Sequence, residues 1–319
     1  MDTIMRRVFG LGETVLDLIF KDDQPVGAKA GGSALNALVS LARMGANAHF
    51  ITEVGKDRVG DMIVRFLEQN DLSTQYVNRF DGGKSALALA FLNDNNDADY
   101  EFFKDYPTQR LAGEIPDFTA DDIIVFGSFF GINPVIRPRL LDVLEAAKKA
   151  GAIIIYDPNF RKHHDHHKHQ FIEVIEENFR LSDIVRGSDE DFMNIYGLSQ
   201  PQKVYDKVSV FCDNLVVTAN AKGVYAFGKN FGHHFHVPVI KPISTIGAGD
   251  NFNAGMMKAL LDLNLKRNDL LELSADQWQQ LIVYGIEFSS EVCLNLDNYV
   301  PVDFKYRFNE LVGYQLKEN

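Results

Sequence analysis

A glycine-rich segment in the last third of the chain places an acidic residue beside a loop suited to binding anions. Residues 244–250 read Ser-Thr-Ile-Gly-Ala-Gly-Asp, and small and apolar residues that suit a packed helix follow them. Glycines in a loop that opens a helix leave backbone N–H groups unpaired, and the helix dipole adds partial positive charge there. The segment therefore predicts a cradle for an anionic group such as a phosphate.

Asp250, the last residue of this segment, has two interpretations. In phosphoryl transfer, a carboxylate accepts the proton of the attacking hydroxyl while fixed donors hold the phosphoryl charge. The backbone N–H groups of Gly247, Ala248 and Gly249 would be those donors. An aspartate that merely caps a helix after a glycine turn is also a common arrangement. The segment by itself is compatible with both.

A second pair of glycines, Gly31 and Gly32, precedes an alanine-rich helical segment near the start of the chain. Adjacent glycines let the backbone approach a ligand closely. Asn36 lies about one helical turn beyond Ser33, on the adjoining face. A plain junction between a loop and a helix would contain the same residues. The glycine pair therefore indicates a ligand site only together with the loop at 247–250.

The elements that must position these residues alternate between strand and helix. Short apolar runs at 123–126, 153–156 and 215–217 are bounded by Gly, Pro, Asp or Asn, as expected for strands buried on both faces. Between the first two, residues 135–150 have helical spacing and Gly151 ends them. This rhythm predicts an α/β fold with a doubly wound, mostly parallel sheet flanked by helices.

Two stretches break this rhythm and predict a small β-sheet lid over a ligand. Residues 14–20 alternate between two faces, with Val15, Asp17 and Ile19 on one and Leu16, Leu18 and Phe20 on the other. Residues 85–93 and 100–104 form a hairpin through the polar turn at 94–97. We therefore expect one domain over residues 1–319, with a lid built from discontinuous segments at about 13–30 and 84–106.

Composition excludes several classes of function. The 319 residues carry a formal charge of −12, which argues against the broad cationic face that nucleic-acid binding requires. Cys212 and Cys293 lack the spacing of a metal site or redox pair, and we expect buried thiols in a reducing compartment. The N-terminal residues fit neither a signal peptide nor a membrane span, so we expect a cytoplasmic protein with no membrane partner.

Two further features are assigned to structure rather than chemistry. The histidine-rich segment at 163–169 could bind a transition metal, but we interpret it as a solvated turn. The phenylalanine pairs at 102–103 and 129–130 could contact a sugar, but we expect them to pack in the lid or core.

Taken together, these residues resemble the ribokinase-like (PfkB) family of carbohydrate kinases. That family has an N-terminal glycine pair with an asparagine four residues on, matched here by Gly32 and Asn36, and glycines at the spacing of Gly45 and Gly55. Its C-terminal Gly-Ala-Gly-Asp element is matched at 247–250. The resemblance implies that Asp250 is the catalytic base and that Gly247, Ala248 and Gly249 stabilise the transferred phosphoryl group.

The resemblance also implies a set of sugar-binding residues. The segment at 12–17 is similar to the family's opening strand, which gives Asp17 a role in binding sugar hydroxyls beside Gly31, Gly32 and Asn36. Residues 156–161 resemble the Asp-Pro-Asn-x-Arg segment of fructokinase-like and ketodeoxygluconate-kinase-like members. Asn159 and Arg161 are accordingly placed at the bottom of the active site.

A third set would bind the nucleotide and its metal. Residues 217–223 resemble the family's nucleotide loop, with Asn220 where glycine is usual. The nucleotide-binding candidates are Ser188, Thr218, Asn220, Gly223 and Gly249. Glu190 and Asp191 fall where the family organises Mg²⁺, which suits support through water. An N-cap with an acidic first turn explains Ser188 to Asp191 equally well.

The resulting prediction is an ATP-dependent kinase that transfers the γ-phosphoryl group to a hydroxyl, primary in our expectation, of a small sugar such as fructose or 2-keto-3-deoxygluconate. ATP and Mg²⁺ are the implied cofactors, with a monovalent cation as an additional candidate. The alternatives are a nucleoside or ribose kinase of the same family and a non-catalytic sugar or nucleotide sensor. Unpaired edges of the lid sheet predict a homodimer through the lid.

Overall fold

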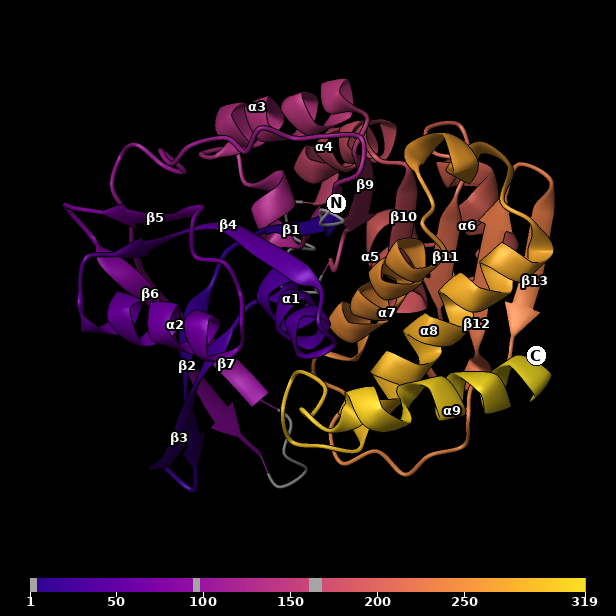
Figure 1. The fold of residues 1–319 in the computed structure, drawn as a ribbon. Helices are drawn as coiled ribbons and strands as arrows, with labels where there is room; N and C mark the ends of the chain where they lie inside the picture. Colours follow the sequence, from indigo (N-terminus) through magenta and orange to yellow (C-terminus); the bar gives the residue numbers. More distant parts are fainter. Residues whose placement is uncertain (1–4, 94–97, 161–167, 319) are drawn as a thin grey trace.

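The structure is a computed structural model that describes residues 5–93, 98–160 and 168–318. Its centre is a nine-stranded sheet of order β13-β12-β11-β10-β9-β8-β1-β4-β5 (Figure 1). All neighbours from β11 to β5 are parallel, and β12 and β13 are added antiparallel at one edge. In sheet order the strands are Phe231–Phe235, Val224–Gly228, Leu215–Thr218, Ile184–Ser188, Ile153–Asp157, Ile123–Gly127, Arg7–Leu11, Asn47–Gly55 and Val77–Phe80.

The central strands form because their residues are apolar on both sides. Every residue of β9 is buried, as are Ile123 to Phe126 of β8. Strands of this kind need helices over both faces of the sheet. The three apolar runs identified in the sequence are confirmed as β8, β9 and β11.

Helices cover both faces and separate the core into two layers. One layer contains α1 (Ser33–Arg43), α2 (Arg58–Gln69), α7 (Ala248–Asp262), α8 (Ala275–Cys293) and α9 (Phe304–Glu318). The other contains α3 (Arg137–Ala150), α4 (Lys168–Leu181), α5 (Asp189–Tyr196) and α6 (Pro201–Val208). Figure 1 shows the two groups on opposite sides of the strands. This confirms the doubly wound fold, and the left-handed Gly151 ends α3 as expected.

A separate four-stranded sheet, the lid, lies at the lower left of Figure 1. Its order is β3 (Gln24–Gly31), β2 (Val15–Lys21), β6 (Lys84–Leu92) and β7 (Ala98–Asp105). β2–β3 and β6–β7 are antiparallel pairs, and β2 runs parallel to β6. The predicted small sheet is therefore confirmed, although the turn at 94–97 lies outside the described residues.

Two smaller expectations concern the thiols and the membrane. Cys212 and Cys293 are both buried and free, as predicted. Within the described ranges, no helix has the length and apolar character needed to cross a membrane.

Candidate active site

The site is a cavity of about 290 Å³ at the carboxyl ends of β1, β8 and β9, with the lid along one side. Parallel strands leave a crevice at this edge, which is where open α/β sheets bind ligands. Lid strands contribute Val15, Asp17, Tyr100 and Phe102 to the wall. The N-terminal parts of α1 and α7 contribute Ser33, Asn36, Asp250 and Asn253.

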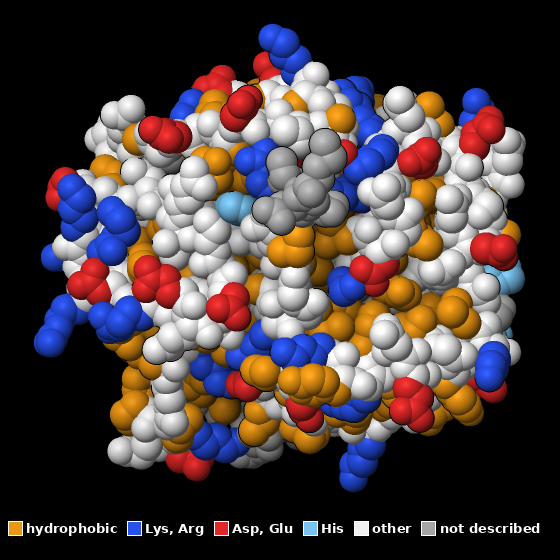
Figure 2. Space-filling model, viewed as in Figure 1, with side chains coloured by type: hydrophobic (Ala, Val, Ile, Leu, Met, Phe, Trp, Pro, Cys, Tyr) orange, Lys and Arg blue, Asp and Glu red, His pale blue; other side chains and the backbone are white. Residues whose placement is uncertain are grey.

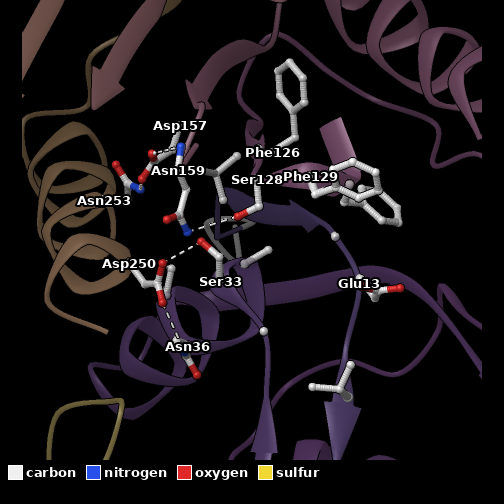
Figure 3. A pocket seen from close by; sticks show the side chains of 18 of the residues that line it. Glu13, Ser33, Asn36, Phe126, Ser128, Phe129, Asp157, Asn159, Asp250 and Asn253 are labelled. Carbon is white, nitrogen blue, oxygen red and sulfur yellow. Dashed lines mark hydrogen bonds between the residues drawn. The ribbon is translucent and has the colours of Figure 1, made fainter. Parts of the chain in front are cut away.

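Asp250 lies at the meeting point of two helices. Its Oδ1 accepts a hydrogen bond from the Ser33 hydroxyl, and its Oδ2 accepts one from Asn36 Nδ2 at 2.8 Å (Figure 3). The N-cap of α7 is Gly247, three residues earlier, so Asp250 is not the capping residue. The carboxylate is instead fixed on the cavity wall by side chains of α1.

Gly247 shapes the loop in front of Asp250. Its φ of 79° is accessible mainly to glycine, and a Cβ there would lie 2.8 Å from the carbonyl oxygen of Asn298. Because the N-cap is a glycine, no side chain caps the first turn of α7. Asn251 fastens the loop by donating to the carbonyl groups of Gly247 and Asn298, both at 2.8 Å. The result fits the predicted anion cradle.

Asp17 lies on the lid side of the same cavity. A Cβ on Gly31 would come within 2.3 Å of Asp17 Oδ2, so only glycine leaves room for this carboxylate. Gly32 has a φ of 137°, and a Cβ on it would lie 2.4 Å from the carbonyl oxygen of Glu13. Burial raises the pKa of Asp17 to about 7, because a low-dielectric surrounding disfavours the charged carboxylate.

A buried polar network forms the floor of the site. Asp157, the last residue of β9, accepts hydrogen bonds from Arg186 Nη1 at 2.9 Å and Asn253 Nδ2 at 2.6 Å. Arg186 also donates to Thr218 Oγ1 at 2.7 Å, and its Nη1 would be 2.6 Å from a Cβ on Gly249. The guanidinium thus lies directly beneath the anion cradle and connects three strand ends.

Asn159 follows β9 and projects toward the neighbouring strand end. Its Nδ2 donates to the hydroxyl of Ser128 at 3.0 Å, and both residues line the cavity (Figure 3). Arg161, which the sequence places nearby, lies outside the described residues, as does most of the histidine-rich segment.

The nucleotide candidates lie further along the same sheet edge and do not line the cavity. Ser188 ends β10, Thr218 ends β11, and Asn220 and Gly223 flank the short turn after β11. Asn220 has a φ of 49°, a conformation that asparagine tolerates better than other non-glycine residues. This explains how asparagine replaces glycine at that position.

The two candidates for supporting a metal, Glu190 and Asp191, differ in exposure and in hydrogen bonding. The Asp191 carboxylate accepts hydrogen bonds from Phe160 N, Ser188 N and the Ser188 hydroxyl, all at 2.7 Å. Ser188 reciprocates by accepting from Asp191 N, so the pair forms a capping box at the start of α5. This observation favours the capping interpretation for Asp191, whereas Glu190 is exposed.

The structure adds residues that the sequence did not single out and corrects one expectation. Phe102 and Phe103 do not pack in the lid, because they are 55% and 54% exposed on an edge strand, and Phe102 lines the cavity. Phe130 is buried, as expected. The site residues that were missed are Glu13, Ser33, Ser128, Asp157, Arg186 and Asn253.

Sequence comparison decides the family. Residues 5–276 match the model of the pfkB family of carbohydrate kinases. The chain belongs to this family. This carbohydrate kinase is 28% identical to a probable fructokinase-4 of Arabidopsis thaliana over 80% of its own length and 82% of the relative's. It is 25% identical to a fructokinase of Vibrio alginolyticus over 86% and 90% of the two chains.

Solved structures agree on the fold of this carbohydrate kinase. A fructokinase from Vibrio cholerae O395, in a form with fructose, ADP and calcium bound, superposes with a TM-score of 0.80 at 20% identity, covering 95% and 99% of the two chains. An aminoimidazole riboside kinase from Salmonella enterica gives 0.79 at 20% identity, covering 96% and 99%. At this identity the likeness shows the ribokinase-like fold alone.

Proposed function

We propose that this kinase transfers the γ-phosphoryl group of ATP to a hydroxyl of a small neutral sugar, with fructose as the first candidate. The observation that carries the proposal is Asp250, held by Ser33 and Asn36 at the wall of a sugar-sized cavity and one turn into a helix that opens on the anion cradle. The similarity to fructokinases supports the choice of sugar.

The geometry supports separate roles for different groups in sugar binding, proton transfer and stabilisation of the phosphoryl group. Asp17, Asn36 and Asn159 offer polar groups to sugar hydroxyls from the lid, α1 and the end of β9. The Oδ1 atoms of Asn36 and Asn253 are buried without a hydrogen-bond partner among the described residues, and a bound hydroxyl would satisfy such an acceptor. Asp250 accepts the proton of the attacking hydroxyl while the N–H groups at 247–249 stabilise the phosphoryl charge.

Charge in the cavity favours a neutral sugar over a sugar acid. The described residues that line it include Glu13, Asp17, Asp157 and Asp250, and no lysine or arginine. Within the described part of the wall, a bound carboxylate would approach these acidic groups without a partner cation, which costs free energy. We therefore place fructose ahead of 2-keto-3-deoxygluconate.

ATP would extend from the anion cradle along the ends of β10 and β11, past Ser188, Thr218, Asn220 and Gly223. Mg²⁺ would be held by the phosphates of ATP, with support through water from Glu190, and would neutralise their charge. A structure of a Vibrio cholerae fructokinase contains a bound potassium ion, and by analogy we propose that this kinase also binds a monovalent cation. Free, buried thiols suit a cytoplasmic enzyme.

The lid would also mediate a homodimer. Strands β3 and β7 are the edges of the lid sheet, and Val26, Phe102 and Phe103 are exposed on them. Figure 2 shows hydrophobic side chains gathered at the lower left, where Figure 1 places the lid. Light scattering coupled to size-exclusion chromatography is expected to give twice the chain mass, and a monomer at high concentration would exclude this assembly.

Coupled-assay ATP turnover tests the function. Purified protein with Mg²⁺ is offered fructose, other hexoses, 2-keto-3-deoxygluconate, ribose and nucleosides. Saturable turnover with fructose above all other compounds is the expected result. Preference for the sugar acid would contradict the charge argument, and binding without turnover across the panel would indicate a sensor.

A further inference from the structure

Ser128, immediately after β8, has a backbone conformation that serine rarely adopts. Its φ is 53° and its ψ is −164°, a combination open essentially to glycine. The preceding Gly127 passes so close to the next strand that a Cβ on it would lie 1.8 Å from the carbonyl oxygen of Asp157. Ser128 N then donates to that same oxygen at 2.9 Å. The close approach of the two parallel strand ends imposes the strain on Ser128.

Asn159 shows the same feature at the end of the adjacent strand. The φ of Asn159 is 38°, and its side-chain Nδ2 donates a hydrogen bond to the Ser128 hydroxyl at 3.0 Å. Two strained non-glycine residues thus meet across neighbouring strand ends, and both line the cavity (Figure 3). Glycine at position 128 would remove the strain, so what serine contributes there is its hydroxyl group.

The hydrogen-bonding capacity of this hydroxyl is only partly used. A serine hydroxyl has one donor and two acceptor lone pairs, and the Asn159 amide occupies one lone pair. No other residue that the structure describes uses the donor or the other lone pair, so both can serve a ligand in the cavity. Because Asn159 fixes the oxygen, the hydroxyl is oriented before a ligand arrives, which lowers the entropy that binding costs.

We propose that Ser128 is a specificity-determining residue that recognises one hydroxyl group of the sugar, with Asn159 as the residue that positions it. The inference rests on the proposed function, since it concerns the sugar half of the same cavity. A site that hydrogen-bonds a substrate hydroxyl discriminates against the analogue lacking it, because its own polar groups are then left unpaired.

Two substitutions separate the hydroxyl from the strain. Ser128→Gly removes both, so we expect a higher melting temperature together with an approximately 10-fold loss of kcat/KM, mainly through KM. Ser128→Ala removes the hydroxyl and keeps the strain, so the same kinetic loss is expected without the gain in melting temperature. Asn264→Gly is the matched control, because Asn264 has a φ of 51° on an exposed turn away from the cavity. It should not change the kinetics.

Monodeoxy analogues of the preferred sugar provide the decisive readout. Wild type should discriminate strongly against one of them, and both Ser128 variants should lose that discrimination while keeping it at the other positions. Unchanged kcat/KM for the sugar and all analogues would overturn the inference. Calorimetric titration with the sugar separates this inference from the proposed function. If wild type binds the sugar without turnover, the proposed function fails. In that case, weaker binding by both Ser128 variants still supports the role of Ser128, and unchanged binding refutes it. No binding by wild type would overturn both.

Discussion

The floor and the lid of the active site are built in opposite ways. On the floor, Asp157, Arg186 and Asn253 are buried, and hydrogen bonds among them connect β9, β10 and α7. On the lid, the whole of β3 up to Ala28 and the described side chains of β7 are exposed. Burial in a parallel sheet fixes the floor in one arrangement, whereas the exposed edge strands of the lid have less packing to hold them in place.

The lid is attached to the rest of the molecule near the cavity by polar contacts. Lys29 of β3 pairs with Asp297 at 2.6 Å. Within the lid, Glu13 accepts hydrogen bonds from Lys104 and Tyr106 of the opposite segment at 2.6 and 2.7 Å. Partly exposed pairs of this type contribute little stability each. We infer that the groups of the floor are fixed in advance and that the edges of the lid adjust when it closes over a substrate.

The largest effect is expected from the floor side of the cavity, with Asp250→Asn. Loss of the base should lower kcat by about 10²- to 10⁴-fold while the melting temperature and nucleotide binding stay near wild type. Asp262→Asn, at the other end of α7 and paired with Lys258 on the surface, removes the same charge as a control. Steady-state kinetics of both variants would measure this, and near-normal turnover by Asp250→Asn would remove Asp250 from its role.

Arg186→Met should disrupt the buried polar network on the floor of the site and destabilise the protein. It leaves the buried Asp157 carboxylate without its cation, which typically destabilises a protein by about 3–5 kcal/mol. Urea unfolding followed by fluorescence of Trp278, the single tryptophan, reports the free energy. The double variant with Asp157→Asn should lose less than the sum of the single variants. Additive losses would show that the pair is not coupled.

The pH dependence of the Asp17→Asn variant tests the region where the lid meets the floor. Because burial raises the pKa of Asp17 to about 7, kcat/KM for the sugar should rise as pH increases through 7 and the carboxylate ionises. The asparagine variant should lack this rise and lose about 10- to 100-fold in kcat/KM at pH 8. A pH profile of kcat/KM for both proteins measures the effect, and an identical profile in the variant would assign the titration to another group.

The same substitution has an opposite effect on stability. The pKa of Asp17 is raised above the ordinary 3.8, so the folded state favours the neutral acid, and stability from this group is lost as pH rises from about 4 through 7. Asp17→Asn should therefore melt at a higher temperature than wild type at pH 8, and the difference should shrink toward pH 4. Differential scanning calorimetry across this range would check the sign.

The smallest effect is expected on the lid, from Lys29→Met. The Lys29–Asp297 pair is partly exposed, so the free energy of unfolding should fall by no more than about 1 kcal/mol. Weaker closure should raise KM for the sugar a few-fold and leave kcat nearly unchanged. A loss as large as that of Arg186→Met in the same urea assay would show that the lid is as firmly built as the floor.

The sequence alone determined the fold class and the main chemical groups. Apolar runs such as 153–156 can be stable only between two layers of helices, and the spacing at 247–250 places an acidic residue after a glycine turn whatever surrounds it. The lid strands were also predictable, because residues 85–93 and 100–104 flank a polar turn at 94–97, as the two strands of a hairpin do. Asp17, Asn36, Asn159 and Asp250 were named in advance and lie on one cavity.

Only the tertiary structure decided how these groups are supported. Arg186 reads in sequence as one charged residue in a strand, and its place under Gly249 depends on which strands are neighbours in the sheet. The contact of Ser33 with Asp250 joins residues 217 positions apart. The strain at Ser128 arises from the close approach of the ends of β8 and β9, which no local pattern encodes. Local preferences follow from adjacent residues, whereas burial, partner choice and strain are properties of the packed chain.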